Sequence, residues 1–486
     1  MASRIALIVF TLLTAGALIS MTSLLGGLAR RVPGVLLAAF SLVILLTPRS
    51  GQLSLGHVGP RQILGVDPVL LVAIGAAARG LPNLARRLGG LRMRCAFILV
   101  MVVTQTALGY LIYRNQALLE VRPLLVLIGL IMFLLSLDEG HDLEQLARSW
   151  LYWTAGALCL LALERAATSG IGNANLRIVT STGDLITSRV ANASQVAVVA
   201  AAGLLSLYEN ARRSSLPTVL RTVAFFAVVL VAQHRSVWVA TTAGVIVLAG
   251  RSVRPQQLTR VVGQFTLLCV LLSPVLVVSG AAAKVGASVS ESLASVSTTT
   301  GTGGARVSST GQLITRARAR GPLIELFGGN YGTPVERIEG GRLVTYQPHD
   351  AYVQAFLNSG LVGLGLFLAV LLSLLRGAWR QRGGGLAIIT LFLVYSFAYS
   401  FPYELAPALA ALFSRTVQAT ETPTAVASET RKGAARRRAT LRACQRTREG
   451  LPSVRGRAKV LADGQLSSPL VPAKVPTSHS GVSAGN

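Results

Sequence analysis

The sequence predicts an all-α polytopic membrane protein with about twelve transmembrane helices and one large loop. Three observations predict this class. Of the 486 residues, 52% are hydrophobic and only 13% are charged, whereas soluble domains carry about a quarter charged residues. The mean hydropathy is +0.57. The apolar residues recur in long runs, and the charged residues cluster in short segments between these runs.

The apolar runs define twelve candidate spans. They cover residues 5–28, 33–47, 64–78, 95–113, 123–137, 149–167, 190–208, 217–233, 236–250, 261–279, 355–375 and 385–401. Their Leu, Val, Ala and Gly composition fits helices, which satisfy their own backbone hydrogen bonds, rather than the alternating pattern of a β-barrel. We interpret the first run as a retained span, because it is longer than a signal-peptide core and lacks a clear cleavage site.

The spans divide the chain into four regions. These are an N-terminal transmembrane bundle of about ten spans (1–279), a large extracytoplasmic loop (280–354), the C-terminal spans (355–414) and a basic tail (415–486). The tail is rich in Ala, Ser, Thr, Pro and Arg without apolar periodicity, which is typical of disorder. Its Arg-rich stretch 431–448 suits contact with anionic lipid, and a solvated extension without function is an equally good interpretation.

Arginine-rich short loops indicate which side of the membrane faces the cytoplasm. The loops assigned to the cytoplasm carry Arg30–Arg31, Arg79–Arg94, Arg212–Arg213, Arg251–Arg260 and Arg376–Arg382. Counting spans then places the segment 168–189, the turn Gln233–Arg235 and the loop 280–354 on the outer face. The same count places both chain ends outside, which conflicts with the basic tail. A further crossing by the short segment 403–413 would remove that conflict for the tail.

Composition also argues against several classes of function. The net charge of +27 lies mostly in short loops and in the tail, where the positive-inside bias puts it, so we do not expect a nucleic-acid partner. The four cysteines follow no metal or disulfide spacing, and we expect no metal and no cofactor. These cysteines are Cys95, Cys159, Cys269 and Cys444.

The first candidate site element is the turn from Gln233 to Trp238, which lies between two spans with almost no loop. An arginine at the membrane boundary, here Arg235, is costly unless its side chain snorkels or finds a partner. Taken alone, the turn is better explained as an interfacial anchor, with Arg235 snorkelling and Trp238 in the aromatic belt.

Two further elements lie in and after the large loop. Glycines precede Arg306 and recur in the segment Gly328–Gly332, where backbone N–H groups can approach an anion closely; an ordinary flexible loop is the alternative. Between these glycines we expect a short amphipathic helix near 308–319. The pair His349–Asp350 then stands at the start of a span. Histidine suits general base catalysis near neutral pH, and the helix dipole there favours an anionic ligand. The alternative is a helix-capping aspartate beside an exposed histidine.

The order of these elements resembles a known family. An Arg-containing turn between spans, a large outer loop, a G-G-x-x-G patch, and the segment His349-Asp350-Ala-Tyr352-Val-Gln354 with a Gly-spaced span after it resemble the O-antigen ligase and polymerase superfamily. These are membrane enzymes of bacterial surface polysaccharide assembly. The resemblance covers residues 175 to 375 in detail. Most family members carry Asn where this chain has Asp350, and an aromatic residue that often follows the Arg306 position is missing here.

The resemblance implies a fold and a function. The fold is similar to the C-type membrane glycosyltransferase architecture, in the bacterial cytoplasmic membrane, with the site facing the extracytoplasmic side. The enzyme would transfer or polymerise a glycan carried on undecaprenyl pyrophosphate, without metal and with inversion of the anomeric carbon. The partners implied are this donor, a glycan or lipid acceptor and the bilayer. Other membrane proteins of polysaccharide assembly are compatible with the resemblance as further partners. Ligation and polymerisation stay open.

Site residues follow from the resemblance and from the chemistry of the leaving group. Arginine binds pyrophosphate through paired hydrogen bonds, so Arg235 and Arg306 are the candidate clamp. His349 would accept the proton of the acceptor hydroxyl or position that hydroxyl. The candidate assisting residues are Arg177, Arg189, Asp350, Tyr352, Gly329 and Gly332.

Three other functions remain as alternatives. A transporter or flippase for a polysaccharide lipid predicts polar residues at mid-span and matched broken helices, and the sequence offers chiefly Asp67 and no obvious repeat. A cell-division-type glycan polymerase would need a catalytic Asp in the large loop without the His349–Asp350 signature. An inactive relative is the last alternative, which the unusual tail favours.

Overall fold

The computed structural model describes most of the chain between residues 22 and 417. The described residues are 22, 24–46, 68–169, 190–213, 215–252, 302–339, 342–344 and 350–417, with the backbone of 177–179 and 185–187 and a few single positions from 254 to 266. The chain separates into one unit at Met1–Pro423 and a second at Thr424–Asn486. The second unit, and with it nearly all of the predicted tail, lies outside the described residues.

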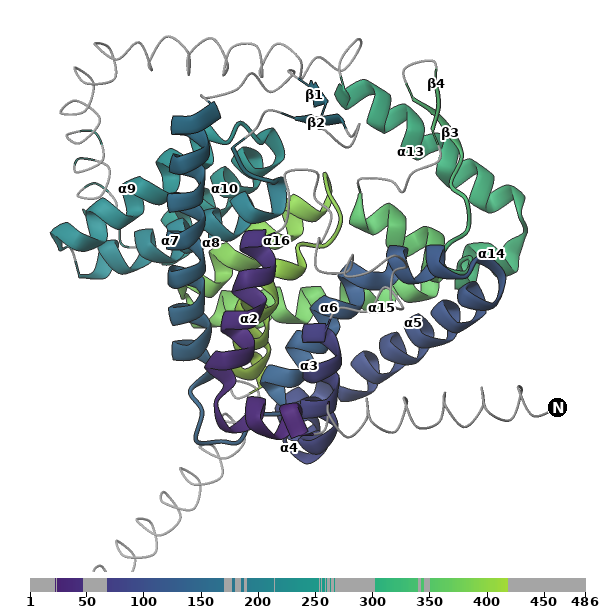
Figure 1. Ribbon diagram of the computed structural model, residues 1–486, viewed down its shortest axis with the longest axis horizontal. Helices are drawn as coiled ribbons and strands as arrows, with labels where there is room; N and C mark the ends of the chain where they lie inside the picture. The colour runs from purple at the N-terminus through teal and green to yellow at the C-terminus, as the bar shows by residue number, and fades with distance from the viewer. Residues whose placement is uncertain are drawn as a thin grey trace, which may run out of the picture. The chain divides into compact units, whose positions relative to one another are not determined.

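Helices dominate the described part (Figure 1). After a helix at Leu24–Arg31 come α2 (Pro33–Leu46), α3 (Pro68–Arg79), α4 (Leu81–Leu88), α5 (Arg92–Tyr113), α6 (Asn115–Leu135), α7 (Leu143–Ser169), α8 (Ala193–Arg212), α9 (Leu216–Val231) and α10 (Arg235–Val247). After the gap come α13 (Thr302–Ala319), α14 (Pro322–Phe327), α15 (Ala351–Gln381) and α16 (Gly384–Ser396), and then a 3-10 turn at Tyr403–Leu405 that continues as helix to residue 417. Two short antiparallel hairpins join β1 (Arg177–Val179) to β2 (Leu185–Thr187) and β3 (Arg337–Glu339) to β4 (Arg342–Val344).

Several helices are apolar enough to cross a membrane. Four described segments qualify by length and composition, namely Leu81–Tyr113, Asn115–Leu135, Leu143–Ala167 and Ala351–Gln381. The first of them contains both α4 and α5. The pair Leu24–Arg31 and Pro33–Leu46, bent by 104°, makes a fifth if it counts as one span. The protein is therefore helical and membrane-embedded, with four or five candidate spans in its described part.

The predicted count of twelve spans is not reproduced in the described residues. Helices α3, α9 and α16 are apolar but short, and a 16-residue helix such as α9 extends only about 24 Å, less than the ~30 Å hydrocarbon core. Other predicted spans, including 261–279 and most of 5–28, lie outside the described residues. The matched spans also extend beyond their apolar runs, because helical hydrogen bonding continues through polar residues such as Glu120 and Arg122 in α6.

Small residues bring the central helices together. Helix α8 packs closely against α9, and α10 packs closely against α16, as their neighbouring positions show (Figure 1). The alanines Ala197, Ala200 and Ala201 on α8 are fully buried, and small residues allow the close approach that stabilises helix pairs in membranes.

The loops that the Arg distribution assigns to the cytoplasm contact one another. Asp138 accepts a hydrogen bond from Arg30 at 2.7 Å, and Arg86 pairs with Glu139. Arg148 lies 3.5 Å from Glu209, which also binds Arg221 at 2.8 Å. The span count also places the loop 138–148 on the cytoplasmic side, and these pairs connect it to Arg30, to Arg86 and to the end of α8, as expected if the segments share one side of the membrane.

The segment after α16 crosses the bundle once more. Tyr399 O accepts a hydrogen bond from Ala351 N at 3.2 Å, beside the start of α15. Sixteen residues further on, Arg415 pairs with Glu144, and Thr416 packs on Gly377 near the end of α15. The chain therefore returns along α15, towards the end of that helix that the Arg distribution assigns to the cytoplasm.

Candidate functional site

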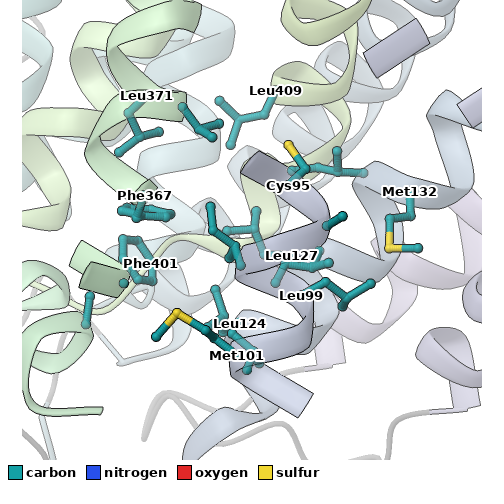
Figure 2. Close-up of a pocket in the computed structure, with 18 of the residues that line it drawn as sticks. Cys95, Leu99, Met101, Leu124, Leu127, Met132, Phe367, Leu371, Phe401 and Leu409 are labelled. Carbon is teal, nitrogen blue, oxygen red and sulfur yellow. The ribbon is translucent and has the colours of Figure 1, made fainter. Parts of the chain in front are cut away.

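An apolar cavity of about 420 Å³ lies between α5, α6 and α15. Figure 2 shows the apolar side chains that converge on it, among them Phe401 and Leu409 of the C-terminal segment. The lining begins at Leu81 and Arg92, near the predicted cytoplasmic ends of α4 and α5, and reaches Tyr331 and Gln354 on the opposite side. A cavity of this chemistry suits a hydrocarbon chain.

Polar side chains form one end of this cavity. Glu120 on α6 is only 8% exposed, and its carboxylate accepts hydrogen bonds from Gly332 N at 2.5 Å and from Asn358 Nδ2 at 2.7 Å. Gln105 on α5 donates to Phe327 O at 2.5 Å, and Ser359 donates to Gln105 at 3.4 Å. Because buried polar groups need partners, this network fixes α5, α6, α15 and the end of the large loop to one another.

A kink in α15 receives the glycine patch of the loop. Gly360 has φ +62° and Gly328 has φ +80°, a region that side chains other than glycine rarely adopt. A Cβ on Gly360 would overlap the backbone of Leu326, and one on Gly328 would overlap the backbone of Asn358. Gly329 N donates to Leu357 O, three residues before the kink, at 2.7 Å. Gly328 and Gly329 therefore pack directly against the backbone of α15 at its kink.

This arrangement bears on the predicted role of the glycines. The sequence predicts that their N–H groups bind an anionic ligand, whereas in the structure the N–H of Gly332 donates to the side chain of Glu120. The N–H of Gly329 donates its hydrogen bond to Leu357 O. Contact of Gly329 or Gly332 with a pyrophosphate stays a prediction, and it would require these two bonds to be exchanged.

Asp350 and Tyr352 hold the start of α15. Asp350 Oδ1 accepts hydrogen bonds from Tyr352 N at 2.9 Å and Val353 N at 3.1 Å, which is N-capping and confirms the simpler interpretation of this aspartate. Burial raises the pKa of Asp350, although the two N–H groups act to lower it. Tyr352 OH donates to Leu393 O at 3.0 Å, and its ring packs on Phe397.

The turn between α9 and α10 is confirmed. Arg235 is the first residue of α10, and it does not line the cavity. His234 is buried, and its Nε2 lies 2.8 Å from Ala191 O, so Nε2 carries the proton. Trp238 Nε1 donates to Val229 O at 2.8 Å. The turn is thus tied to the start of α8.

The remaining predicted residues are placed only in part. His349 and Arg189 lie outside the described residues. Arg177 lies in β1, and Arg306 lies in α13, with only their backbones described. The structure therefore does not test whether Arg235, Arg306 and His349 meet.

The C-terminal half of α13 packs against its neighbours. The amphipathic helix predicted near 308–319 is confirmed and begins earlier, at Thr302. Leu313 packs with Val335 and with Val353 in the first turn of α15. The side chain of Gln312 forms two hydrogen bonds with the backbone of Ile338, at 3.3 and 3.1 Å. The helix that carries Arg306 thus packs on the start of the helix that follows His349.

Two charged residues of α6 are not among the predicted site residues. Glu120 and Arg122 are both buried, at 8% and 7% exposure. Their signal was present in the sequence, because a Glu and an Arg stand two residues apart directly before the apolar run 123–137. Ionisable residues buried inside a membrane helix indicate a functional or structural site by default, whereas the predicted spans 95–113 and 123–137 leave both residues in the loop between them.

Within the part of the chain that the structure describes, no group of three or more His, Cys, Asp or Glu side chains is placed to hold a metal ion. Comparison of the chain with protein-family models, curated proteins and solved structures finds no match.

Proposed function

We propose that this protein is a membrane glycosyltransferase that moves a glycan from a polyprenyl pyrophosphate to an acceptor hydroxyl on the outer face of the membrane. One observation carries the proposal. The cavity that suits a hydrocarbon chain is lined at one end by Gln354 and Tyr331, which belong to the two segments that resemble the O-antigen ligase and polymerase superfamily. The C-type architecture with further spans outside the described residues is part of the proposal.

The proposed chemistry uses this chain's own side chains. The acceptor oxygen attacks the anomeric carbon while the bond from that carbon to the pyrophosphate oxygen breaks, which inverts the carbon. His349 takes the hydroxyl proton, and Arg235 and Arg306 bind the pyrophosphate that leaves. Removing a well-placed cation of this kind costs about 3–4 kcal/mol of transition-state stabilisation.

The arrangement of the loop supports these roles. Helix α13 packs through Leu313 on Val353, so the backbone of Arg306 and the residue after His349 belong to neighbouring helices. The first turn of α15 also contributes Gln354 to the cavity. A donor chain in the cavity would therefore bring its head group toward this end of the bundle.

A transporter for a polysaccharide lipid is the second candidate. The cavity lining reaches from Arg92 near one end of α5 to Gln354 near the other membrane side, and a path through the membrane is what a transporter requires. The two candidates differ in where lipid-linked units accumulate when the protein is missing.

In-cell glycan analysis tests the proposal. The gene is deleted and restored as wild type, His349→Ala, Arg306→Ala or Arg320→Ala, and long-chain polysaccharide and lipid-linked oligosaccharide are followed. Arg320→Ala is the matched control, because Arg320 is an exposed arginine directly after α13. We expect the deletion and the first two variants to lose long chains and to accumulate short lipid-linked units on the outer face.

Two outcomes would contradict the proposal. Accumulation of the units on the inner face would support the transporter instead. Normal long chains in His349→Ala and Arg306→Ala cells, at wild-type protein levels, would remove both residues from the site.

A further inference from the structure

The short helix α14 exposes large apolar side chains although it belongs to the predicted outer loop. Leu323 is 72% exposed, Leu326 is 42% exposed and Phe327 is 50% exposed. A cluster of this kind is unusual on a surface that meets water. What covers the cluster depends on how deep α14 lies relative to the neighbouring spans.

Helix α5 gives the first measure of that depth. Gln105 Nε2 donates to Phe327 O at 2.5 Å. Gln105 precedes Tyr113, the last residue of α5, by eight residues, which is about 12 Å along the helix axis. A strong tilt of 40° would still leave about 9 Å of depth. Tyr110, Tyr113 and Arg114 at this end of α5 have the residue types of a membrane interface.

Helix α15 gives a second and independent measure. Gly360, which packs against the backbone of Leu326 and Phe327, lies ten residues after the N-cap Asp350. This is about 15 Å from the start of the helix. Both spans therefore place the end of α14 well inside their outer ends, at a depth comparable with one leaflet of the ~30 Å hydrocarbon core.

The spans that α14 contacts also expose large apolar side chains. Leu111 and Ile112 on α5 are 66% and 61% exposed, and Leu361 on α15 is 49% exposed. These residues lie on helices that are candidate membrane spans, so their exposed faces are expected to meet lipid. Leu361 directly follows Gly360, which contacts α14.

The charge pattern around α14 agrees with a segment that enters the membrane and returns. Arg318 and Arg320 precede it, and Glu336 follows it. Between 321 and 335 the only charged residue is Glu325, and its carboxylate pairs with Arg318 at 3.1 Å. Charged residues avoid the hydrocarbon core unless they are paired or can reach its edge.

We propose that residues 321–332 form a re-entrant element of the large loop, with Leu323, Leu326 and Phe327 in contact with the acyl chains of the outer leaflet. The irregular backbone at Gly328–Gly332 is tolerated at this depth because it is buried against α5, α6 and α15. This inference concerns how the loop meets lipid, and it does not depend on the proposed enzymatic activity.

Depth-dependent fluorescence quenching tests the inference. A full-length variant without its four cysteines receives one cysteine at Leu323, Phe327, Leu111 or Glu336, is labelled with an environment-sensitive fluorophore and is reconstituted in phosphatidylcholine vesicles. Chain-brominated phosphatidylcholine and aqueous iodide serve as the two quenchers. Leu111→Cys is the lipid-facing reference on a candidate span, and Glu336→Cys is the exposed control on the same loop.

We expect the probe at Leu323 to be quenched by brominated lipid as strongly as the probe at Leu111, and hardly by iodide. The probe at Glu336 should show the reverse. Quenching of both α14 probes by iodide alone would overturn the inference, and protection from both quenchers would overturn it in favour of a protein partner on this surface. Phe327→Cys keeps the test decisive if Leu323→Cys does not fold.

Discussion

The two ends of the bundle are held together in different ways. At the predicted outer end, the glycine patch is inserted into the kink of α15 and tied to the buried carboxylate of Glu120. At the predicted cytoplasmic end, ion pairs such as Arg86–Glu139 link exposed loops, with side-chain exposures of 62% and 70%. Buried hydrogen bonds and backbone contacts tolerate little change, whereas exposed ion pairs contribute about 0–1 kcal/mol each. Substitutions at the predicted outer end should therefore lower the stability of the protein more than substitutions at the predicted cytoplasmic end.

The largest loss of stability is expected from a substitution at the kink of α15. Gly360→Ala places a Cβ against the backbone of Leu326 at a φ of +62°, so strain and overpacking together should cost about 3 kcal/mol or more. Gly365→Ala is the matched control on the same helix, because a Cβ there meets nothing within 4 Å. Thermal unfolding of the detergent-solubilised variants measures both. Equal melting temperatures for the two variants would show that the kink does not hold the loop.

The next effect is expected at Glu120. Glu120→Ala leaves Gly332 N–H and the Asn358 amide without their acceptor, which should cost about 1–3 kcal/mol of unfolding free energy. Glu139→Ala, at an exposed carboxylate, should change stability by less than about 1 kcal/mol. Protease susceptibility of the large loop gives a second readout, since the loop should loosen only in Glu120→Ala. An unchanged loop would argue that the glycine patch alone anchors it.

A smaller effect is expected at the cap of α15. Asp350→Ala removes an acceptor for Tyr352 N and Val353 N and should cost about 1 kcal/mol, whereas Asp350→Asn keeps a good capping residue. Unfolding of the two variants can be followed by circular dichroism. Equal losses in both variants would contradict a capping role.

Asp350 also predicts a pH dependence. Burial raises its pKa above the ordinary value of 3.8, so the folded state binds the proton more readily than the unfolded state does. The stability contributed by this group is then present at low pH and falls as the pH rises from 3.8 through the folded pKa. Asp350→Asn cannot titrate, so its stability relative to wild type should increase over that range. A difference that is constant with pH would contradict the prediction.

The smallest change in stability is expected at the exposed Arg86–Glu139 ion pair of the predicted cytoplasmic end. A double-mutant cycle of Arg86→Ala and Glu139→Ala should give a coupling free energy below about 1 kcal/mol, and added salt should reduce it further. A coupling as large as the effect of Glu120→Ala would reverse the ranking of the two ends.

Much of the helical architecture was readable from the sequence. The runs 95–113, 149–167 and 355–375 each lie within a candidate span of the structure, and the run 123–137 overlaps another, which ends at Leu135. The reason is that a long apolar run leaves few alternatives to a membrane helix. The short runs were less informative. The number of crossings among α3, α9 and α16 depends on tilt and on neighbouring helices, which a run of apolar residues does not encode.

The site was predictable in part. The sequence indicated the turn at Arg235, the amphipathic helix before the glycine patch and the cap at Asp350, because each follows from local backbone chemistry. It gave no sign that the N–H of Gly332 meets Glu120, which lies 212 residues away along the chain. Pairings at such a separation are decided by helix packing.

The sequence by itself determined that this is a helical membrane protein and which loops carry its positive charge, since hydrophobic length and charge distribution act locally. Only the tertiary structure decided that the chain crosses the bundle again at residues 401–417, and that α14 lies beside Gln105 and Gly360. The physical reason is that glycine permits close approach and a polar side chain requires a partner, but the identity of the neighbour emerges only when the helices are packed.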